Sequence, residues 1–208
     1  MLRIGLTGGL GSGKSTVAEM LRESGVPIVE ADAVAHEMIR RGGPAYAEIV
    51  SIFGTGILLP GGEIDRKKLA DAAFLSQEKL ARLDGIVHPH VLERIGRWLG
   101  EREREGAAVA VVEAPLLVET GYHRRLDRLV VVWCRPEQQA ERLRLRGMSQ
   151  EDAERRAAVQ MPLEEKKRLA DDTIDNSGAL DETRRQVARL VGEWKQVAKE
   201  SRQAAKED

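Results

Sequence analysis

The fold of this chain is decided by one stretch near its beginning, Gly8-Gly9-Leu10-Gly11-Ser12-Gly13-Lys14-Ser15-Thr16. The stretch reads G-x-x-x-x-G-K-[ST], which is the phosphate-binding P-loop. The apolar run 2–7 before it predicts a buried strand. The apolar spacing over 16–23 predicts a helix after it, with Gly25 as the stop. Strand, glycine-rich loop and helix is the order that the motif requires.

The chemistry of this loop follows from its backbone geometry. Glycines let successive N–H groups point at phosphate oxygens, and the helix start adds its positive end. Lys14 can reach the β- and γ-phosphates, Ser15 can offer its hydroxyl to Mg²⁺, and Thr16 supports the α-phosphate region. The alternative is a glycine loop that only caps a helix. Lys14 followed by two hydroxyl residues suits a helix cap poorly. The expected cofactor-binding residues here are Gly8, Gly11, Ser12, Gly13, Lys14, Ser15 and Thr16.

Length and composition limit the class of protein. The chain has 208 residues, 42% of them hydrophobic, which suits one α/β domain with an elaboration. The formal net charge of −1 gives no bulk attraction to nucleic acid or to an anionic membrane, so neither partner is expected. A single cysteine, Cys134, fits a reducing cytoplasm, and neither a leader segment nor a membrane span is recognisable. The oligomeric state does not follow from the sequence; a monomer is the expectation.

Further segments alternate between strand and helix patterns. Strands are expected at 27–32, 108–112, 129–134 and 172–175, which with 2–7 makes five. Between 33 and 105 the sequence favours helices and turns, with one helix ending near Leu83 and another beginning at Pro89. Helices are also expected at 136–146, from Ser149 to about Met161, and from 179 to about 202.

The strands that follow helical crossovers predict a parallel α/β sheet with helices on both faces. Ligands in such sheets bind outside the carboxyl ends of the strands. Thr7, Asp32, Glu113 and Arg135 would all emerge at that edge. Asp32 there could take a proton from an attacking hydroxyl, or it could cap the helix that follows. Glu113 could serve Mg²⁺ or be an ordinary carboxylate at a strand end.

Basic residues after the 129–134 strand form a second candidate group. Arg142 and Arg146 lie four residues apart on one helical face and could close over nucleotide phosphates. The alternative is a solvated face paired with Glu137 and Glu141. His88 could face a ligand, although the residues around it lack the spacing of a zinc site.

Several motifs, taken together, resemble the bacterial dephospho-coenzyme A kinases. The resemblance begins with residues 6–18 and continues through Glu30-Ala31-Asp32, where the family usually has Asp-Ala-Asp. The other matching motifs, in the family's order, are Val87-His88-Pro89, Pro115-Leu116-Leu117-Val118-Glu119, Arg135-Pro136-Glu137-Gln138-Gln139 with Arg142, and Ile174-Asp175-Asn176-Ser177-Gly178. The motifs span residues 2–178. Glu30 and Glu113 depart from the family's Asp and weaken a metal role for both positions.

The resemblance implies a P-loop NTPase fold with a helical CoA-binding part at 33–105, a lid at 138–165 and a nucleotide core made of the rest. It implies transfer of the γ-phosphoryl group of ATP, with Mg²⁺, to the ribose 3′-hydroxyl of dephospho-CoA, the last step of coenzyme A biosynthesis. Asp32, Lys14 and Arg142 would then be catalytic, and Arg146 and Asn176 would contact ATP. Asp32, His88, Leu116 and Leu117 would contact the acceptor.

Two other functions fit parts of the sequence. A P-loop kinase could act on a nucleoside, a nucleotide or a shikimate-like acceptor instead. A nucleotide-dependent switch or binding module would bind without turnover, but the Asn-Lys-x-Asp guanine motif of switch GTPases does not occur in the sequence.

Overall fold

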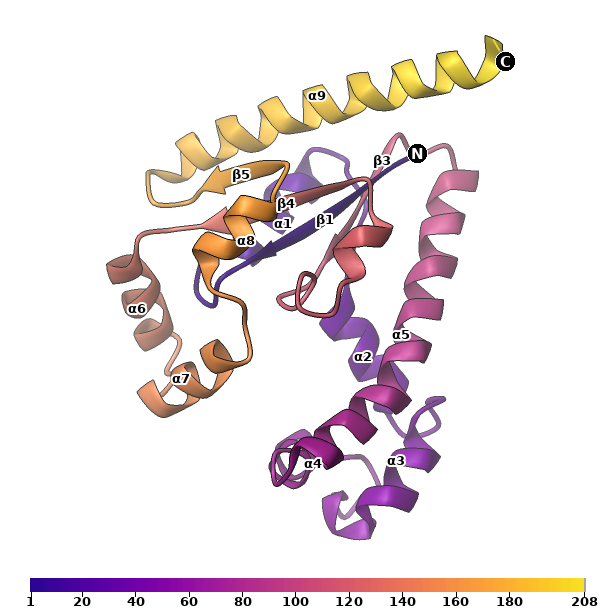
Figure 1. Cartoon of the computed structure of the whole chain (residues 1–208), viewed down its shortest axis with the longest axis vertical. Coiled ribbons are helices and arrows are strands. Elements are labelled where there is room, and N and C mark those ends of the chain that lie inside the picture. Colours follow the sequence, from indigo (N-terminus) through magenta and orange to yellow (C-terminus); the bar gives the residue numbers. More distant parts are fainter. Residues whose placement is uncertain (208) are drawn as a thin grey trace. The chain divides into compact units, whose positions relative to one another are not determined.

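The computed structural model describes residues 1–207, with side chains for residues 1–204 (Figure 1). The chain divides into two compact units, each described here by itself. Unit 1 comprises Met1–Ile28 and the described residues from Glu101 onward, and unit 2 comprises Val29–Gly100. Among the described residues, no helix is both long enough and apolar enough to cross a membrane.

Unit 1 holds most of the sheet and the helices that cover it. Its elements are β1 (Leu2–Gly8), α1 (Lys14–Glu23), β3 (Val109–Glu113), β4 (Arg128–Trp133), α6 (Pro136–Leu145), α7 (Gln150–Ala158), α8 (Leu163–Leu169), β5 (Asp172–Asp175) and α9 (Leu180–Glu207). A short 3₁₀ helix, Tyr122–Arg125, precedes β4. The strand β2 (Ile28–Glu30) crosses the boundary into unit 2.

The sheet has five strands in the order β2-β3-β1-β4-β5, which confirms the five-stranded parallel sheet expected from the sequence. β1 lies at its centre, parallel to β3 and β4, and Gly8 at its end pairs with Val132. The connection out of β1 therefore leaves the sheet between two neighbours, at the carboxyl edge where ligands bind in open parallel sheets.

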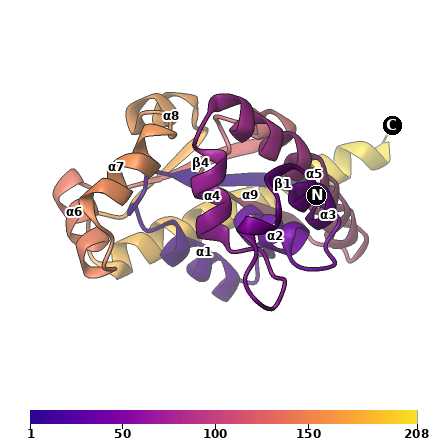
Figure 2. The ribbon, with the colours of Figure 1, turned by 90° about the horizontal axis from the view of Figure 1, so that it is seen from below.

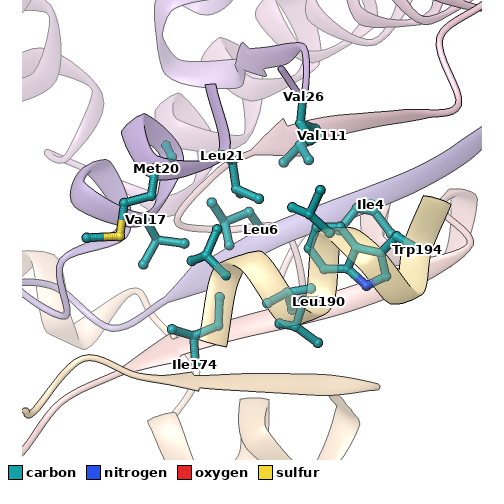
Figure 3. Packing of buried hydrophobic residues seen from close by; sticks show 14 of the residues in the cluster. Ile4, Leu6, Val17, Met20, Leu21, Val26, Val111, Ile174, Leu190 and Trp194 are labelled. Carbon is teal, nitrogen blue, oxygen red and sulfur yellow. The ribbon is translucent and has the colours of Figure 1, made fainter. Parts of the chain in front are cut away.

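The two faces of the sheet are covered by different helices. On one face, α1 and α9 pack on alternate residues of the strands, and Trp194 and Leu190 of α9 lie against Ile4 of β1 (Figure 3). On the other face α8 contacts β4, where Leu163 packs against Leu129 and Val131. Figure 2 shows α8 on the side of the sheet opposite α1 and α9. Burial on both faces explains why the strand sequences are continuously apolar.

Unit 2 is built almost entirely from helices. They are α2 (Ala31–Ile39), α3 (Tyr46–Phe53), α4 (Arg66–Ala73), most of α5 (Gln77–Arg104) and a 3₁₀ helix at Thr55–Ile57. One isolated antiparallel bridge, Leu58 with Ile64, interrupts the turn-rich segment before α4. Asp65 caps α4 by accepting hydrogen bonds from Lys67 N and Lys68 N. The helical character expected for 33–105 is confirmed in this part of the chain.

The expected position of Asp32 is wrong. The sequence predicted a strand at 27–32 ending in this acid, or a helix cap, but β2 is only three residues long and α2 begins at Ala31. Asp32 is therefore inside the first turn of α2, where a carboxylate interacts favourably with the positive helix end. The cap position is Glu30, whose side chain makes no capping hydrogen bond.

The expected break at His88-Pro89 is also wrong, because α5 runs through Pro89 without interruption. Ile86 and Val91 on either side of the proline are both buried, so packing of one apolar face continues across it. Position 85, four residues earlier, is a glycine. The proline removes only the hydrogen bond that an N–H at position 89 would donate to the Gly85 carbonyl.

We expect Pro89→Ala to stabilise unit 2. Alanine restores the missing N–H and is the best helix former, so the free energy of unfolding should rise by about 1 to 3 kcal/mol. Urea denaturation followed by circular dichroism measures the change. A lower midpoint than that of the original chain would contradict the expectation and would mean that the proline ring makes packing contacts that outweigh its cost to the helix.

Candidate active site

The P-loop of unit 1 adopts the conformation that its glycines permit. Gly13 is the residue before α1 and has a φ of 91°, in the left-handed region. A Cβ at Gly13 would also collide with the side-chain amide of Asn176, and one at Gly8 would collide with the carbonyl oxygen of Val132. The loop closes on itself through Ser12 N, which donates to the Gly9 carbonyl at 3.1 Å.

The start of α1 has the features of an anion-binding helix terminus. It has no side-chain cap and no acidic residue in its first turn, whereas Asp65 and Ser149 cap α4 and α7. The first backbone N–H groups of a helix lack intrahelical acceptors, and they carry the positive end of the helix dipole. A helix start of this kind, preceded by a glycine loop, has the backbone arrangement that binds phosphate in P-loop proteins.

Lys14 lies directly over this loop. Its ammonium nitrogen donates to the carbonyl oxygens of Gly8 and Gly9, at 3.1 and 3.4 Å. The next residue, Ser15, is exposed in the first turn of α1. The charge that would meet a phosphate is therefore held within the loop, and the hydroxyl of Ser15 is accessible beside it.

Arg142 of α6 and Asn176 after β5 are both bonded to the P-loop. The Arg142 guanidinium donates to the carbonyl oxygens of Ser12, at 3.3 Å, and Asn176, at 2.9 Å. The buried Asn176 amide donates to Ser12 O at 2.9 Å and accepts from the Thr183 hydroxyl at 3.0 Å. The side chain of Asn176 thus ties the P-loop to the start of α9.

We expect Asn176→Ala to lower the free energy of unfolding by about 1 to 3 kcal/mol, because it leaves the buried Thr183 hydroxyl without its acceptor. Denaturation by urea measures the loss, with Thr173→Ala at an exposed position of β5 as the matched control. If Asn176→Ala were as stable as that control, the amide would have no tethering role, and its bonds to Ser12 and Thr183 would contribute nothing to the free energy of unfolding.

The start of α6 is fastened to the loop after β5. Ser177 Oγ accepts from Arg135 N at 3.1 Å, and its carbonyl oxygen accepts from Gln138 Nε2 at 2.7 Å. Gln139 on the same helix donates to the carbonyl of Leu10 in the P-loop. Beside Ser177 lies a cavity of about 290 Å³, lined by Trp133, Arg135, Asp175, Ser177, Gly178, Glu182 and Gln186.

Cys134 packs beneath the P-loop. Its thiol is buried and lies 3.7 Å from the carbonyl oxygen of Gly11. Burial raises the pKa of the thiol, and nearby Arg142 opposes that shift only in part. The sulfur therefore stays protonated and serves packing and a weak hydrogen bond rather than nucleophilic chemistry.

The remaining candidates of unit 1 divide into buried and exposed residues. Leu117 is 1% exposed and contributes to the core, whereas Leu116 beside it is only partly buried. Glu113 is at the end of β3, in register with Leu6 of β1. Arg146 follows the last residue of α6 and is exposed, one turn beyond Arg142. Arg142 bonds to the P-loop, at the carbonyl oxygen of Ser12.

Unit 2 holds the other candidates, Asp32 and His88. Asp32 is exposed, one turn before His36 on α2. The Arg66 guanidinium lies 2.6 Å from His36 Nε2 and 3.0 Å from Nδ1, and because a guanidinium can only donate, a ring nitrogen is the acceptor. Partial burial, and then Arg66, lower the pKa of His36, while the Asp32 carboxylate opposes them. His88 is exposed on α5 and pairs with Asp84 one turn earlier, at 3.8 Å.

A magnesium site made by the protein alone is not present in the part of the chain that the structure describes. No group of three or more His, Cys, Asp or Glu side chains there could hold a metal ion. Mg²⁺ in phosphoryl-transfer sites keeps several waters and uses one or two protein oxygens plus the nucleotide phosphates. The exposed hydroxyl of Ser15 beside the uncapped helix start fits that kind of site.

Sequence reasoning missed the residues that hold the site together. Gln138 and Gln139 lie in a family motif but had no role assigned to them, and they bond to Ser177 and Leu10. Thr183, outside the motifs, bonds to Asn176. Lys166 is the clearest case, since its side chain is completely buried within the charged helix α8. That helix itself was not expected, because the segment reads as the end of the lid.

Comparison with known proteins adds one consistent finding. The family model described as Dephospho-CoA kinase matches residues 2–182. The dephospho-CoA kinase of Aquifex aeolicus is 47% identical over 196 residues, covering 93% of this chain and 97% of that protein. The dephospho-CoA kinase of Corynebacterium glutamicum is 45% identical over 194 residues, with 93% and 97% covered.

Solved structures agree with the sequence relatives. A crystal structure of a Thermus thermophilus protein matches with a TM-score of 0.80 and 33% identity, covering 92% of this chain and 97% of that one. A dephospho-CoA kinase from Campylobacter jejuni matches with a TM-score of 0.70 and 26% identity, covering 93% and 97%.

Proposed function

The chain belongs to the dephospho-CoA kinase family, and from this premise we propose that it transfers the γ-phosphoryl group of ATP to the ribose 3′-hydroxyl of dephospho-CoA. The products are CoA and ADP. The observation that carries the proposal is the P-loop of unit 1, with Lys14 over an uncapped helix start, in a chain similar to these kinases over nearly its whole length.

We assign the ATP phosphates to the P-loop. The backbone N–H groups at the start of α1 would face the phosphate oxygens, and Lys14 would exchange its bonds to Gly8 and Gly9 for bonds to the β- and γ-phosphates. Ser15 would hold Mg²⁺, which supplies charge neutralisation between the phosphates. Arg142, already bonded to the carbonyl of Ser12, is in the same unit and would stabilise charge on the migrating group.

The purine base of ATP fits the cavity beside Ser177. Trp133 and Arg135 at its wall offer flat surfaces for stacking, and the backbone of Gly178 offers polar groups for the base edge. In this assignment the Asn176 side chain does not read the base, because Ser12 and Thr183 already use it. It contributes by fixing the loop that borders the cavity.

The residues assigned to the acceptor are those that the family resemblance indicates. Asp32 is our proposed general base, which orients the 3′-hydroxyl and takes its proton late, since the transition state of phosphoryl transfer is loose. His88, Leu116 and Leu117 are proposed for the acceptor side, and among them Leu117 would act through packing because it is buried. We propose residues 33–105 as the CoA-binding part and 138–165, which contains α7, as a lid that excludes water.

Purified protein with Mg-ATP and dephospho-CoA tests the function directly. We expect CoA, detected by mass spectrometry, in equal amount to ADP. Nucleosides and a shikimate-like acid serve as competing acceptors, since another small-molecule kinase is the alternative. ADP release with one of these and no CoA would overturn the proposal, and so would nucleotide binding without turnover of any acceptor. A monomeric cytoplasmic enzyme belongs to the same proposal, and its mass in solution can be measured by light scattering.

A further inference from the structure

Unit 1 contains a buried ammonium group that the proposed reaction does not use. Lys166 lies in α8 with a side chain 0% exposed, although the helix is otherwise charged and solvated. Its nitrogen donates to the carbonyl oxygen of Pro115 at 2.8 Å and pairs with Glu119 Oε1 at 2.8 Å. Moving a charged pair out of water costs free energy, so the Lys166–Glu119 pair is expected to have a role beyond packing.

The partners of Lys166 belong to a loop at the carboxyl edge of the sheet. We name residues 115–119 the acceptor loop, because they follow β3 and contain Leu116 and Leu117. Lys166 holds this loop at both of its ends, through the Pro115 carbonyl and the Glu119 carboxylate. Between those two points Leu117 is packed in the core and Leu116 remains partly exposed.

The same two groups connect the acceptor loop to other parts of the site. The Pro115 carbonyl also accepts from the hydroxyl of Thr7, one residue before the end of β1, at 3.2 Å. Glu119 Oε1 also accepts from the backbone N–H of Met161, in the connection between α7 and α8, at 2.7 Å. One ammonium therefore joins the strand before the P-loop, the acceptor loop and the base of the lid segment.

The cluster is poorly suited to a purely stabilising role. Glu119 Oε2 is buried and makes no hydrogen bond in the structure, which leaves part of its desolvation uncompensated. Leu163 and Met161 already attach this region to Val118 and Leu129 by apolar contact. An apolar pair at 119 and 166 would hold α8 in place at equal or lower free energy, but it could not fix the Pro115 carbonyl.

We propose that Lys166 is a positioning residue for the acceptor: it sets the acceptor loop against the end of β1 and the base of the lid. This inference rests on the proposed function for the identity of the acceptor. Lys166 does not touch the reacting atoms in this view. It acts through the backbone at Pro115, so its loss should weaken acceptor binding while leaving the P-loop contacts with ATP intact.

The test compares Lys166→Met, Lys166→Met with Glu119→Gln, and Arg168→Met as an exposed control on α8. We expect Lys166→Met to raise the KM for dephospho-CoA about tenfold, the effect of losing one charged hydrogen bond, and to leave the KM for ATP unchanged. Lys166→Met should also be less stable, because Glu119 is left as an unpaired buried charge. The double variant should regain stability but keep the raised KM, since the Pro115 carbonyl still lacks the charged donor and keeps only the Thr7 hydroxyl.

Three results would overturn the inference. They are an unchanged KM for dephospho-CoA in Lys166→Met, an equal rise of both KM values, and a double variant whose KM returns to normal together with its stability. Hydrogen exchange without substrates gives an independent readout: peptides covering 115–119 and 159–163 should exchange faster in Lys166→Met and not in Arg168→Met. If the unaltered chain makes no CoA, the proposed function fails. Faster exchange in Lys166→Met would then still support the structural link that Lys166 makes through Pro115 and Glu119.

Discussion

Lys14→Met is expected to reduce kcat by about 10³-fold, the upper end of what one preorganised charge contributes in a transition state. The ammonium is held over the P-loop by the carbonyls of Gly8 and Gly9, so it needs little reorganisation to meet a phosphate. Methionine keeps an unbranched side chain of similar length and removes the charge together with its N–H donors. ATP affinity should fall as well, because Lys14 contacts ground state and transition state alike.

Steady-state kinetics and titration calorimetry with ATP check this expectation. The matched control is Lys199→Met, which removes an exposed lysine charge from α9 without altering the P-loop. Thermal unfolding of Lys14→Met should stay close to that of the original chain, since the side chain is only partly buried. Turnover within a few-fold of normal would remove Lys14 from its assigned role and would leave the phosphates to the P-loop backbone and Arg142.

The P-loop and the parallel sheet could be predicted because their signals are local. A glycine-rich loop between an apolar run and an amphipathic segment specifies β1, the loop and α1 within 22 residues, from Leu2 to Glu23. Strands buried on both faces are continuously apolar, which made β3 and β4 recognisable. Ser149 was recognised as a cap for the same reason, and its hydroxyl accepts from Asp152 N.

Errors arose where tertiary contacts outweighed local propensity. Pro89 predicts a helix start, but buried residues on both sides of it keep α5 continuous. Asp32 looked like the end of a strand because Ile28 and Val29 before it are β-branched, yet the strand ends at Glu30. At Pro89, packing on both sides of the proline keeps the helix continuous. At Asp32, the strand is shorter than its sequence suggests, so the helix begins earlier.

The supporting contacts of the site could not be predicted at all. Asn176 and Ser12 are 164 residues apart in sequence, and Lys166 and Pro115 are 51 apart. Nothing local distinguishes the buried Lys166 from the partly buried Lys167 and the exposed Arg168 that follow it. Asn176 lies in a motif, but its bond to Ser12 is seen only in the fold, and Lys166 carries no motif at all.

Asp32→Asn is expected to lower kcat by about 10²-fold or more, the range for loss of a general base, with the KM for ATP unchanged. Asparagine has the same shape and can still hydrogen-bond the 3′-hydroxyl, but it cannot take its proton. The carboxylate is exposed in the first turn of α2, so the change should leave the fold intact, apart from a small loss of interaction with the helix end.

Glu37→Gln is the matched control, since it removes an exposed carboxylate from the same helix. Initial rates of CoA formation at saturating ATP and dephospho-CoA give kcat for both variants. A deficit in Asp32→Asn that appears in the KM for dephospho-CoA and not in kcat would make Asp32 a binding residue. Near-normal rates would exclude it as the base. A large fall in kcat in Asp32→Asn that is absent from Glu37→Gln would place proton transfer on this carboxylate. An unchanged KM and an unchanged stability would exclude weaker binding and loss of the fold as its cause.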